Sequence, residues 1–184
     1  RADSDFKALL PSLGEVLRLV KEVAAARAQA LGVPLYDALL DRYEPGGSAA
    51  RIDGIFGELE KFLTRVLPQV LERQRSRPRP QLPSGPFALD RQKALGERMM
   101  RAMGFDFTRG RLDVSHHPFC GGASDDVRIT TRYDEADFSS ALFGVLHEPG
   151  HALYEQNLPA AFRYQPVGEA RGMSVHESQS LLME

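Results

Sequence analysis

FGVLHEPGHALYEQ, residues 143 to 156, is the stretch of this chain that decides the fold. Its histidines, His147 and His151, are four residues apart, so on a helix they lie one turn apart on the same face and both imidazoles can reach one ion at about 2.0–2.1 Å. Glu148 follows the first histidine, where its carboxylate can take a proton from a water that the metal activates and pass it to a leaving amine. The spacing therefore predicts a helix that carries a zinc hydrolase site.

The two middle positions of this motif, Pro149 and Gly150, form a pair that is typical of a turn. Inside a helix, Pro149 removes the hydrogen bond to the Val145 carbonyl at a cost of about 3 kcal/mol, and it disfavours helical geometry at Glu148. The bonds beyond the proline remain possible, so we expect a kinked helix that still presents both imidazoles. If the helix is continuous, replacing Pro149 by alanine is expected to raise the stability by about 1–3 kcal/mol.

A catalytic zinc site needs a third protein ligand and an open position, and several carboxylates compete for that role. Glu155 lies on the same face as the histidines, but the three positions span two turns, about 12 Å along the axis, which is too far for one ion. Glu169, Glu177 and Glu184 fall on a last helix that we predict from about Gly168 to the end of the sequence. That helix could return antiparallel to the first and present a carboxylate, and the spacing alone does not choose among the three.

The rest of the chain is mainly helical in its pattern, because apolar residues recur at steps of three and four. The pattern predicts helices over residues 4–32, 35–42, 48–71, 90–103 and 137–156. Ser48 and Asp137 are expected to cap two of them, and Pro11 is tolerated if the first helix begins there. Residues 126 to 133 alternate polar and apolar side chains and are the best strand candidate. We expect a mainly α fold, a zincin-like helical core with a small β element near the site.

Two further stretches bear on how the chain is organised. The apolar stripe from Ile52 to Leu71 is continuous and is expected to pack against another surface. Residues 76 to 86 are rich in proline, which removes backbone donors and favours extended chain, and we interpret them as a connection within one domain. With 184 residues, the chain is long enough for one domain or for a piece of a larger one.

Composition excludes several classes of partner. The 23 basic and 25 acidic residues form no long run of either sign, so neither nucleic acid nor an anionic membrane is expected as a partner. Cys120 is the only cysteine, which excludes an internal disulfide, and no hydrophobic run approaches the ~18 residues that span a bilayer. We therefore expect a cytoplasmic protein. The sequence begins with Arg1 and not with methionine, and it ends within an apolar helical pattern. We therefore expect both ends to be boundaries within a longer protein.

Four motifs, in order along the chain, resemble those of the carboxypeptidase Taq family of metallocarboxypeptidases. They are HPF at residues 117–119, DxRxT at 126–130, HExGHALYEQ at 147–156 and HESQS at 176–180. PLYDALLDRYEPG, residues 34 to 46, also resembles the helical region upstream of the site in that family. The similarity thus runs over most of the chain, and Pro149 is a departure from the family pattern.

The resemblance implies that His147, His151 and Glu177 hold the metal, zinc or another divalent ion such as cobalt, and that Glu148 is the general base and acid. It implies a hydrolase that releases C-terminal amino acids from peptides, and a homodimer. Glu169 and Glu184 are left to support a ligand or to lie on the surface. Because family members are longer and carry downstream motifs that help to hold the substrate's terminal carboxylate, we interpret residues 1–184 as a single partial catalytic domain.

Other motif residues are expected to support the chemistry. The strand at residues 126 to 133 could pair with an extended peptide substrate, and Arg128 could contact that substrate or form an internal ion pair, which we favour. His117 is assigned either a supporting role at the site or, more often for such a residue, a structural one. His116 and Cys120 are interpreted as structural.

Two alternatives to a metallocarboxypeptidase remain open from the sequence. One is a non-catalytic helical module that binds metal or another protein, which both Pro149 and the expected missing segments favour. The other is an endopeptidase or aminopeptidase of the wider zincin group, because a metal-binding helix does not by itself decide which bond is cut.

Overall fold

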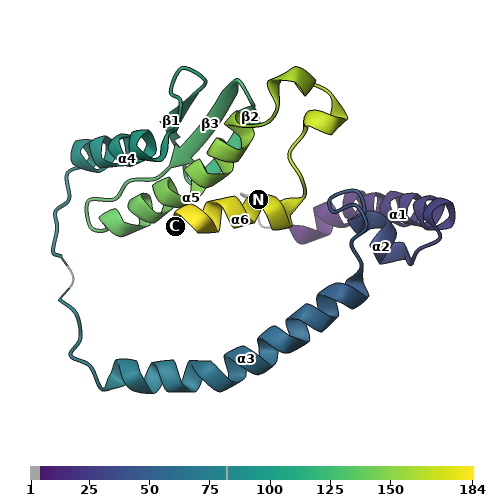
Figure 1. The fold of residues 1–184 in the computed structure, drawn as a ribbon, viewed down its shortest axis with the longest axis horizontal. Coiled ribbons are helices and arrows are strands. Elements are labelled where there is room, and N and C mark those ends of the chain that lie inside the picture. Colours follow the sequence, from purple (N-terminus) through teal and green to yellow (C-terminus); the bar gives the residue numbers. More distant parts are fainter. Residues whose placement is uncertain (1–4, 82) are drawn as a thin grey trace. The chain divides into compact units, whose positions relative to one another are not determined.

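The computed structural model describes residues 5–81 and 83–184 and shows a mainly helical chain with one small sheet (Figure 1). The predicted fold class, mainly α with a small β element, is confirmed. The chain divides into two compact units, Arg1–Pro78 and Arg79–Glu184. Each unit is described by itself below.

The first unit contains three helices: α1 (Phe6–Leu31), α2 (Leu35–Leu40) and α3 (Ala49–Arg75). The Ser48 side chain accepts a hydrogen bond from the Arg51 amide at 3.3 Å, so the predicted cap of α3 is confirmed. In contrast, α1 does not begin at Pro11. The Asp5 carboxylate caps it by accepting a bond from the Ala8 amide at 3.1 Å, and the proline lies inside the helix.

Polar contacts join the three helices of this unit. The Arg27 guanidinium on α1 donates to the Ala38 carbonyl of α2 at 2.9 Å, and the carboxylate of Asp37 accepts a bond from the Ala49 amide at the start of α3 at 2.9 Å. The apolar stripe of α3 was expected to pack against another surface, and the described residues of this unit do not cover it. No residue of α3 is buried, and Phe62 is 49% exposed.

The second unit is built around a three-stranded sheet in the order β1-β3-β2. Its strands are β1 (Gly110–Val114), β2 (Phe119–Ala123) and β3 (Asp126–Thr131), with β1 parallel and β2 antiparallel to β3. The predicted strand corresponds to β3, but it ends two residues before Tyr133. Because β3 is the central strand and is paired on both sides, it has no free edge for a peptide, and the expected pairing of substrate with this strand is wrong.

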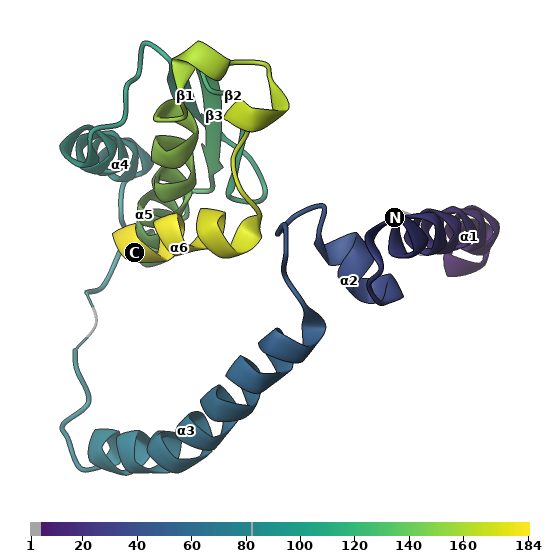
Figure 2. The same ribbon diagram turned by 45° about the vertical axis from the view of Figure 1, so that its right-hand side comes forward.

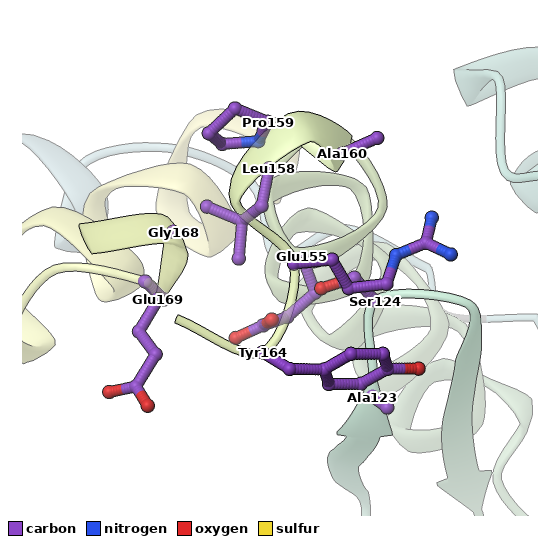
Figure 3. A pocket seen from close by; sticks show the side chains of 11 residues that line it. Ala123, Ser124, Glu155, Leu158, Pro159, Ala160, Tyr164, Gly168 and Glu169 are labelled. Carbon is purple, nitrogen blue, oxygen red and sulfur yellow. The ribbon is translucent and has the colours of Figure 1, made fainter. Parts of the chain in front are cut away.

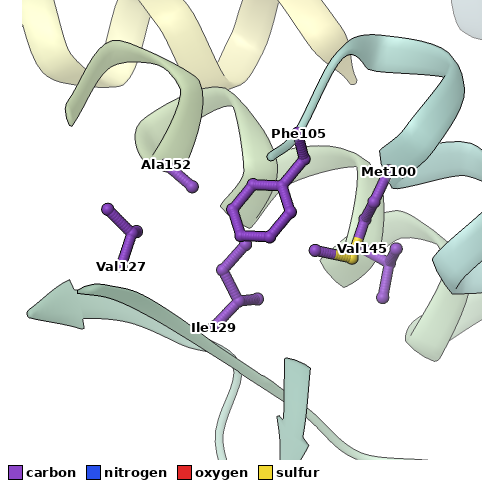
Figure 4. Close-up of a cluster of buried hydrophobic side chains, with 6 residues drawn as sticks. All are labelled: Met100, Phe105, Val127, Ile129, Val145 and Ala152. Atoms are coloured by element: carbon purple, nitrogen blue, oxygen red, sulfur yellow. The ribbon is translucent and has the colours of Figure 1, made fainter. Parts of the chain in front are cut away.

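One helix, α5 (Phe138–Gln156), lies across the sheet, with α4 (Leu89–Met103) beside it (Figures 1 and 2). Alternate residues of β3 point toward α5 and are buried, as the period of two in the sequence predicts. The core between these elements is a cluster of apolar side chains (Figure 4): Met100, Phe105, Val127, Ile129, Val145 and Ala152. This packing fixes α5 against the sheet and leaves the opposite side of α5 to a further helix.

The helix of the HEPGH motif is continuous. Asp137 caps it, as predicted, and accepts bonds from the Ser139 amide and from the Ser139 and Ser140 hydroxyls. These bonds lower the pKa of Asp137 to about 2, because they stabilise its charged form. Pro149 lies inside α5, and its side chain is fully buried. The Pro-Gly pair therefore does not form a turn here.

We expect the replacement of Pro149 by alanine to raise the free energy of unfolding by only about 0–1 kcal/mol, less than the sequence suggests. Removal of proline from a helix interior gains about 3 kcal/mol. Loss of its two buried methylene groups lowers the free energy of unfolding by about 0.8 kcal/mol each. The unfolded chain also gains conformational entropy without the proline ring, which lowers that free energy further, by about 0.4–1 kcal/mol. Urea-induced unfolding of both chains measures the difference. A gain of about 2 kcal/mol or more would show that the buried ring contributes nothing to packing.

The last helix, α6 (Met173–Met183), begins five residues after the predicted start at Gly168. The preceding segment instead forms two short 3-10 helices, Ala160–Phe162, which follows Pro159, and Pro166–Gly168, which begins with a proline. In Figure 2, α6 crosses the lower part of α5. The crossing is close at Gly150, where an added Cβ would stand 2.4 Å from the Gln179 carbonyl oxygen and 2.5 Å from the Ser180 Cα. Only glycine permits this approach.

Candidate metal centre

The crossing of α5 and α6 brings three candidate ligands together. His147 and His151 lie one turn apart on α5, and Glu177 reaches them from α6. One ligand atom of each residue lies within 4.8 Å of those of the other two. The Glu177 carboxylate faces both histidines: its Oε1 lies 3.4 Å from His147 Nε2, and its Oε2 lies 3.4 Å from His151 Nε2. Among the described residues, this is the group of histidine, cysteine and carboxylate side chains that could hold an ion.

The distances between these atoms fit a divalent ion. Two ligand atoms that each lie about 2.0–2.1 Å from an ion, at the tetrahedral angle, stand about 3.3–3.4 Å apart. The separation from each Nε2 to Glu177 is 3.4 Å, which matches this value and is long for a hydrogen bond. Two imidazoles and one carboxylate are also the ligand types that zinc accepts in catalytic sites.

Each candidate ligand histidine has a partner on the ring nitrogen that faces away from Glu177. His147 Nδ1 lies 3.2 Å from the Glu184 carboxylate. Of Glu169 and Glu184, which the sequence left as supporting or surface residues, Glu184 is therefore the one placed to support a candidate ligand. His151 Nδ1 lies 2.7 Å from Nδ1 of His176, whose Nε2 lies 3.0 Å from the Glu155 carboxylate. Such contacts orient metal-binding imidazoles.

The contacts of His176 with His151 and Glu155 were not predicted from the sequence. Glu155 was considered only as a ligand and rejected on distance, although its spacing of four from His151 places it on the same stripe of the helix. His176 directly precedes Glu177, and that adjacency was the available signal. What the sequence could not supply was the crossing of the helices that joins the two side chains.

Glu148 is 9% exposed. Burial raises the pKa of its carboxyl, nearby His147 opposes this rise, and the Glu177 carboxylate adds to it. Burial also lowers the pKa of His151, with a further lowering from His176, and so favours the neutral imidazole that binds metal. On the sheet side, burial raises the pKa of the Cys120 thiol to about 12, with smaller contributions from Glu148 and Glu155. Strand β2, which carries Cys120, contacts α5.

His117 and Arg128, which were predicted to support the chemistry, lie outside the group of three candidate ligands. Arg128 forms the internal ion pair that we favoured, with its guanidinium 2.7 Å from the exposed Asp126 carboxylate. The backbone carbonyl of His117 accepts a bond from the Thr130 hydroxyl at 2.8 Å, and its side chain is exposed. Within residues 5–81 and 83–184, neither side chain joins the three candidate ligands.

A pocket of about 360 Å³ lies beside Glu155, which forms part of its lining (Figure 3). Glu155 and Glu169 lie on its wall, together with Arg163 and Tyr164, which both bond to the Asp125 carboxylate. Glu169 thus faces this pocket and not the candidate ligands. Its exposed position agrees with the surface role that the sequence left open.

Comparison with known proteins identifies relatives along the whole chain. Residues 1–184 match the family described as carboxypeptidase Taq (M32) metallopeptidase. The chain is 42% identical to thermostable carboxypeptidase 1 of Thermus thermophilus, over all of this chain and 38% of that protein. It is 41% identical to carboxypeptidase 1 of Bacillus subtilis, over 81% of this chain and 30% of that protein. The chain therefore spans about a third of the length of these relatives.

Solved structures give the same result. Metallocarboxypeptidase 1 of Trypanosoma cruzi is similar with a TM-score of 0.88 and 46% identity, over 100% of this chain and 37% of that one. An M32 carboxypeptidase from Deinococcus radiodurans is similar with a TM-score of 0.83 and 40% identity, over 98% of this chain and 36% of that one. In the part of the chain that the structure describes, no helix is long and apolar enough to cross a membrane.

Proposed function

The chain belongs to the carboxypeptidase Taq (M32) metallopeptidase family, and we propose that it forms part of a metallocarboxypeptidase that releases C-terminal amino acids from peptides. The observation that carries the proposal is the arrangement of both Nε2 atoms against the one carboxylate of Glu177, with Glu148 buried beside them. Residues 1–184 are proposed as part of a single catalytic domain. A cytoplasmic location and a homodimer are proposed with it.

In this proposal, His147, His151 and Glu177 hold a zinc ion or another divalent ion such as cobalt. When bound, the ion supplies Lewis acidity, which polarises the scissile carbonyl and makes a water molecule more acidic. Glu148 takes a proton from the attacking water and transfers it to the nitrogen of the departing amino acid. Its raised pKa suits the first step, because a carboxylate with a higher pKa is a stronger base toward the water.

The sheet offers an edge for the peptide. Because β3 is paired on both sides, the edges of the sheet belong to β1 and β2, and β2 is the edge strand that contacts α5. A peptide that pairs with this edge in extended form would lie with its backbone beside Glu148. His117, just before β2, and Arg128, on β3, support this part of the sheet and have no proposed contact with reacting atoms.

The test is peptide cleavage by the zinc-loaded protein that contains residues 1–184 together with the downstream segments of the family. We expect release of the C-terminal amino acid from short peptides and no release when the C-terminus is amidated. In Glu148→Gln, the rate should fall by about 10²- to 10⁴-fold while one ion per chain is still bound, because the glutamine keeps the shape of the side chain but cannot move the proton. Mass spectrometry of the products and metal analysis measure the two quantities.

Glu135→Gln, which removes an exposed carboxylate of the same unit, is the control and should cleave as the unmodified chain does. One bound ion without any cleavage would contradict the proposal and support a non-catalytic metal-binding module. Cleavage of the amidated peptide at an internal bond or at its N-terminus would instead assign the chain to an endopeptidase or aminopeptidase.

A further inference from the structure

We propose that His176 and Glu155 are positioning residues that hold His151 in the single tautomer able to bind a metal ion. The inference rests on the proposed metal centre and names two residues that act through a ligand without touching the ion. It follows from a continuous line of side chains, Glu155, His176 and His151, that begins on α5, passes through α6 and returns to α5.

The direction of the hydrogen bonds is determined by the carboxylate at one end. An ionised carboxylate can only accept, so Glu155 accepts from the Nε2–H of His176 across 3.0 Å. A neutral His176 then has a bare Nδ1, which can only accept. His151 Nδ1 lies 2.7 Å away and must carry the proton between them.

That assignment leaves His151 Nε2 without a proton. The same nitrogen is the one that faces Glu177 across 3.4 Å. In the other tautomer, Nε2 would carry a hydrogen that points at the ion position, and the lone pair needed for binding would be directed at His176 instead. The line of bonds therefore selects the tautomer that can bind metal before any ion arrives.

The surroundings hold these side chains in place. The side chains of His151, His176 and Glu155 are 11%, 15% and 27% exposed, so little water competes for their bonds. The Tyr154 ring contacts His176 edge-on, with centroids 5.1 Å apart, and restricts rotation of the imidazole. His147 differs, because its Nδ1 contacts the Glu184 carboxylate directly, without an intervening imidazole.

Two measurements on the full chain test the proposal. Long-range ¹H–¹⁵N correlation spectra, recorded without metal at a pH where imidazoles are neutral, report the tautomer of His151. Competition with a chromophoric chelator reports the zinc affinity. We expect the Nδ1–H tautomer of His151 to dominate in the unmodified chain. In Glu155→Gln, the amide can donate to His176 and reverse the line of bonds, so the Nε2–H form should grow and zinc affinity should fall by about 10- to 100-fold.

Asparagine at position 176 provides the rescue variant. Its amide oxygen can occupy the place of Nδ1 and accept from His151 without help from Glu155. We expect His176→Asn to keep zinc affinity within a few-fold of the unmodified chain and His176→Leu, which cannot accept, to lose about 10- to 100-fold. In the His176→Asn background, Glu155→Gln should have no further effect. Circular dichroism confirms that each variant is folded, and Glu135→Gln serves as the matched control.

An unchanged tautomer together with unchanged zinc affinity in Glu155→Gln would overturn the positioning role. Equal losses in His176→Asn and His176→Leu would do the same, because they would indicate packing and not the hydrogen bond. If the unmodified chain binds no zinc, the proposed metal centre fails. The tautomer measurement is made without metal and still decides whether the line of bonds exists, so the two failures are distinguishable.

Discussion

Replacing Gly150 by alanine is expected to force α5 and α6 apart and to remove tight metal binding. The added Cβ would lie 2.4 Å from the Gln179 carbonyl oxygen and 2.5 Å from the Ser180 Cα, and both are backbone atoms of a helix that cannot rotate away. Overpacking of this kind costs about 1–3 kcal/mol or more. Since α6 carries both Glu177 and His176, its displacement would move the candidate third ligand and the proposed positioning residue away from His147 and His151 at once.

Denaturant unfolding and a zinc competition titration measure the two consequences of Gly150→Ala. Gly144→Ala is the matched control, because Gly144 lies on the same helix and its Cβ would meet side-chain atoms of Pro118 only at 3.4 Å, an ordinary contact. An alanine there should stabilise the helix by about 0.5–1 kcal/mol and leave zinc affinity unchanged. Wild-type stability and zinc affinity in Gly150→Ala would contradict the close crossing of the helices.

The second large effect is expected in Glu177→Ala, which should lower zinc affinity by more than about 100-fold. Loss of a supporting residue costs about 10- to 100-fold, and a direct ligand contributes more. The change also leaves two neutral imidazoles with no negative charge between them to offset that of the ion. The chain should remain folded, because the Glu177 side chain is 42% exposed and packs little against the core.

Two further acidic residues of the sequence provide the comparison for Glu177→Ala. Glu184→Ala removes the carboxylate behind His147 and should lower zinc affinity by about 10- to 100-fold. Glu169→Ala should have no effect on affinity, because Glu169 lies on the wall of the pocket. The same chelator competition measures all three variants. Unchanged affinity in Glu177→Ala together with a large loss in Glu169→Ala would reassign the third ligand.

Much of the local structure was predictable, because helices are determined by neighbouring residues. The period of the apolar positions and the capping side chains of Ser48 and Asp137 placed two helix starts correctly. The four-residue spacing placed both histidines on one face. Strand β2, in contrast, was missed because FCGGA contains two glycines and little β-branched content, so only its pairing with β3 makes it a strand.

The composition of the site could be predicted only in part. His147, His151 and Glu148 were available from one motif, whereas the choice of Glu177 over Glu169 and Glu184 required the resemblance to a family. In physical terms, that choice depends on how closely α6 approaches α5, which Gly150 determines through a contact with residues thirty positions away. The same long-range contact brings Glu155 to His176, and no pattern within either helix indicates it.

Anomalous X-ray diffraction at the zinc edge, from a crystal of the zinc-loaded chain, tests most directly whether His147, His151 and Glu177 together hold one ion. We predict a single strong peak that lies about 2.0–2.1 Å from both Nε2 atoms and about 2.0–2.2 Å from an oxygen of Glu177. A peak at Cys120 or at the exposed His117, with no density between the two histidines of α5 and Glu177, would contradict the account.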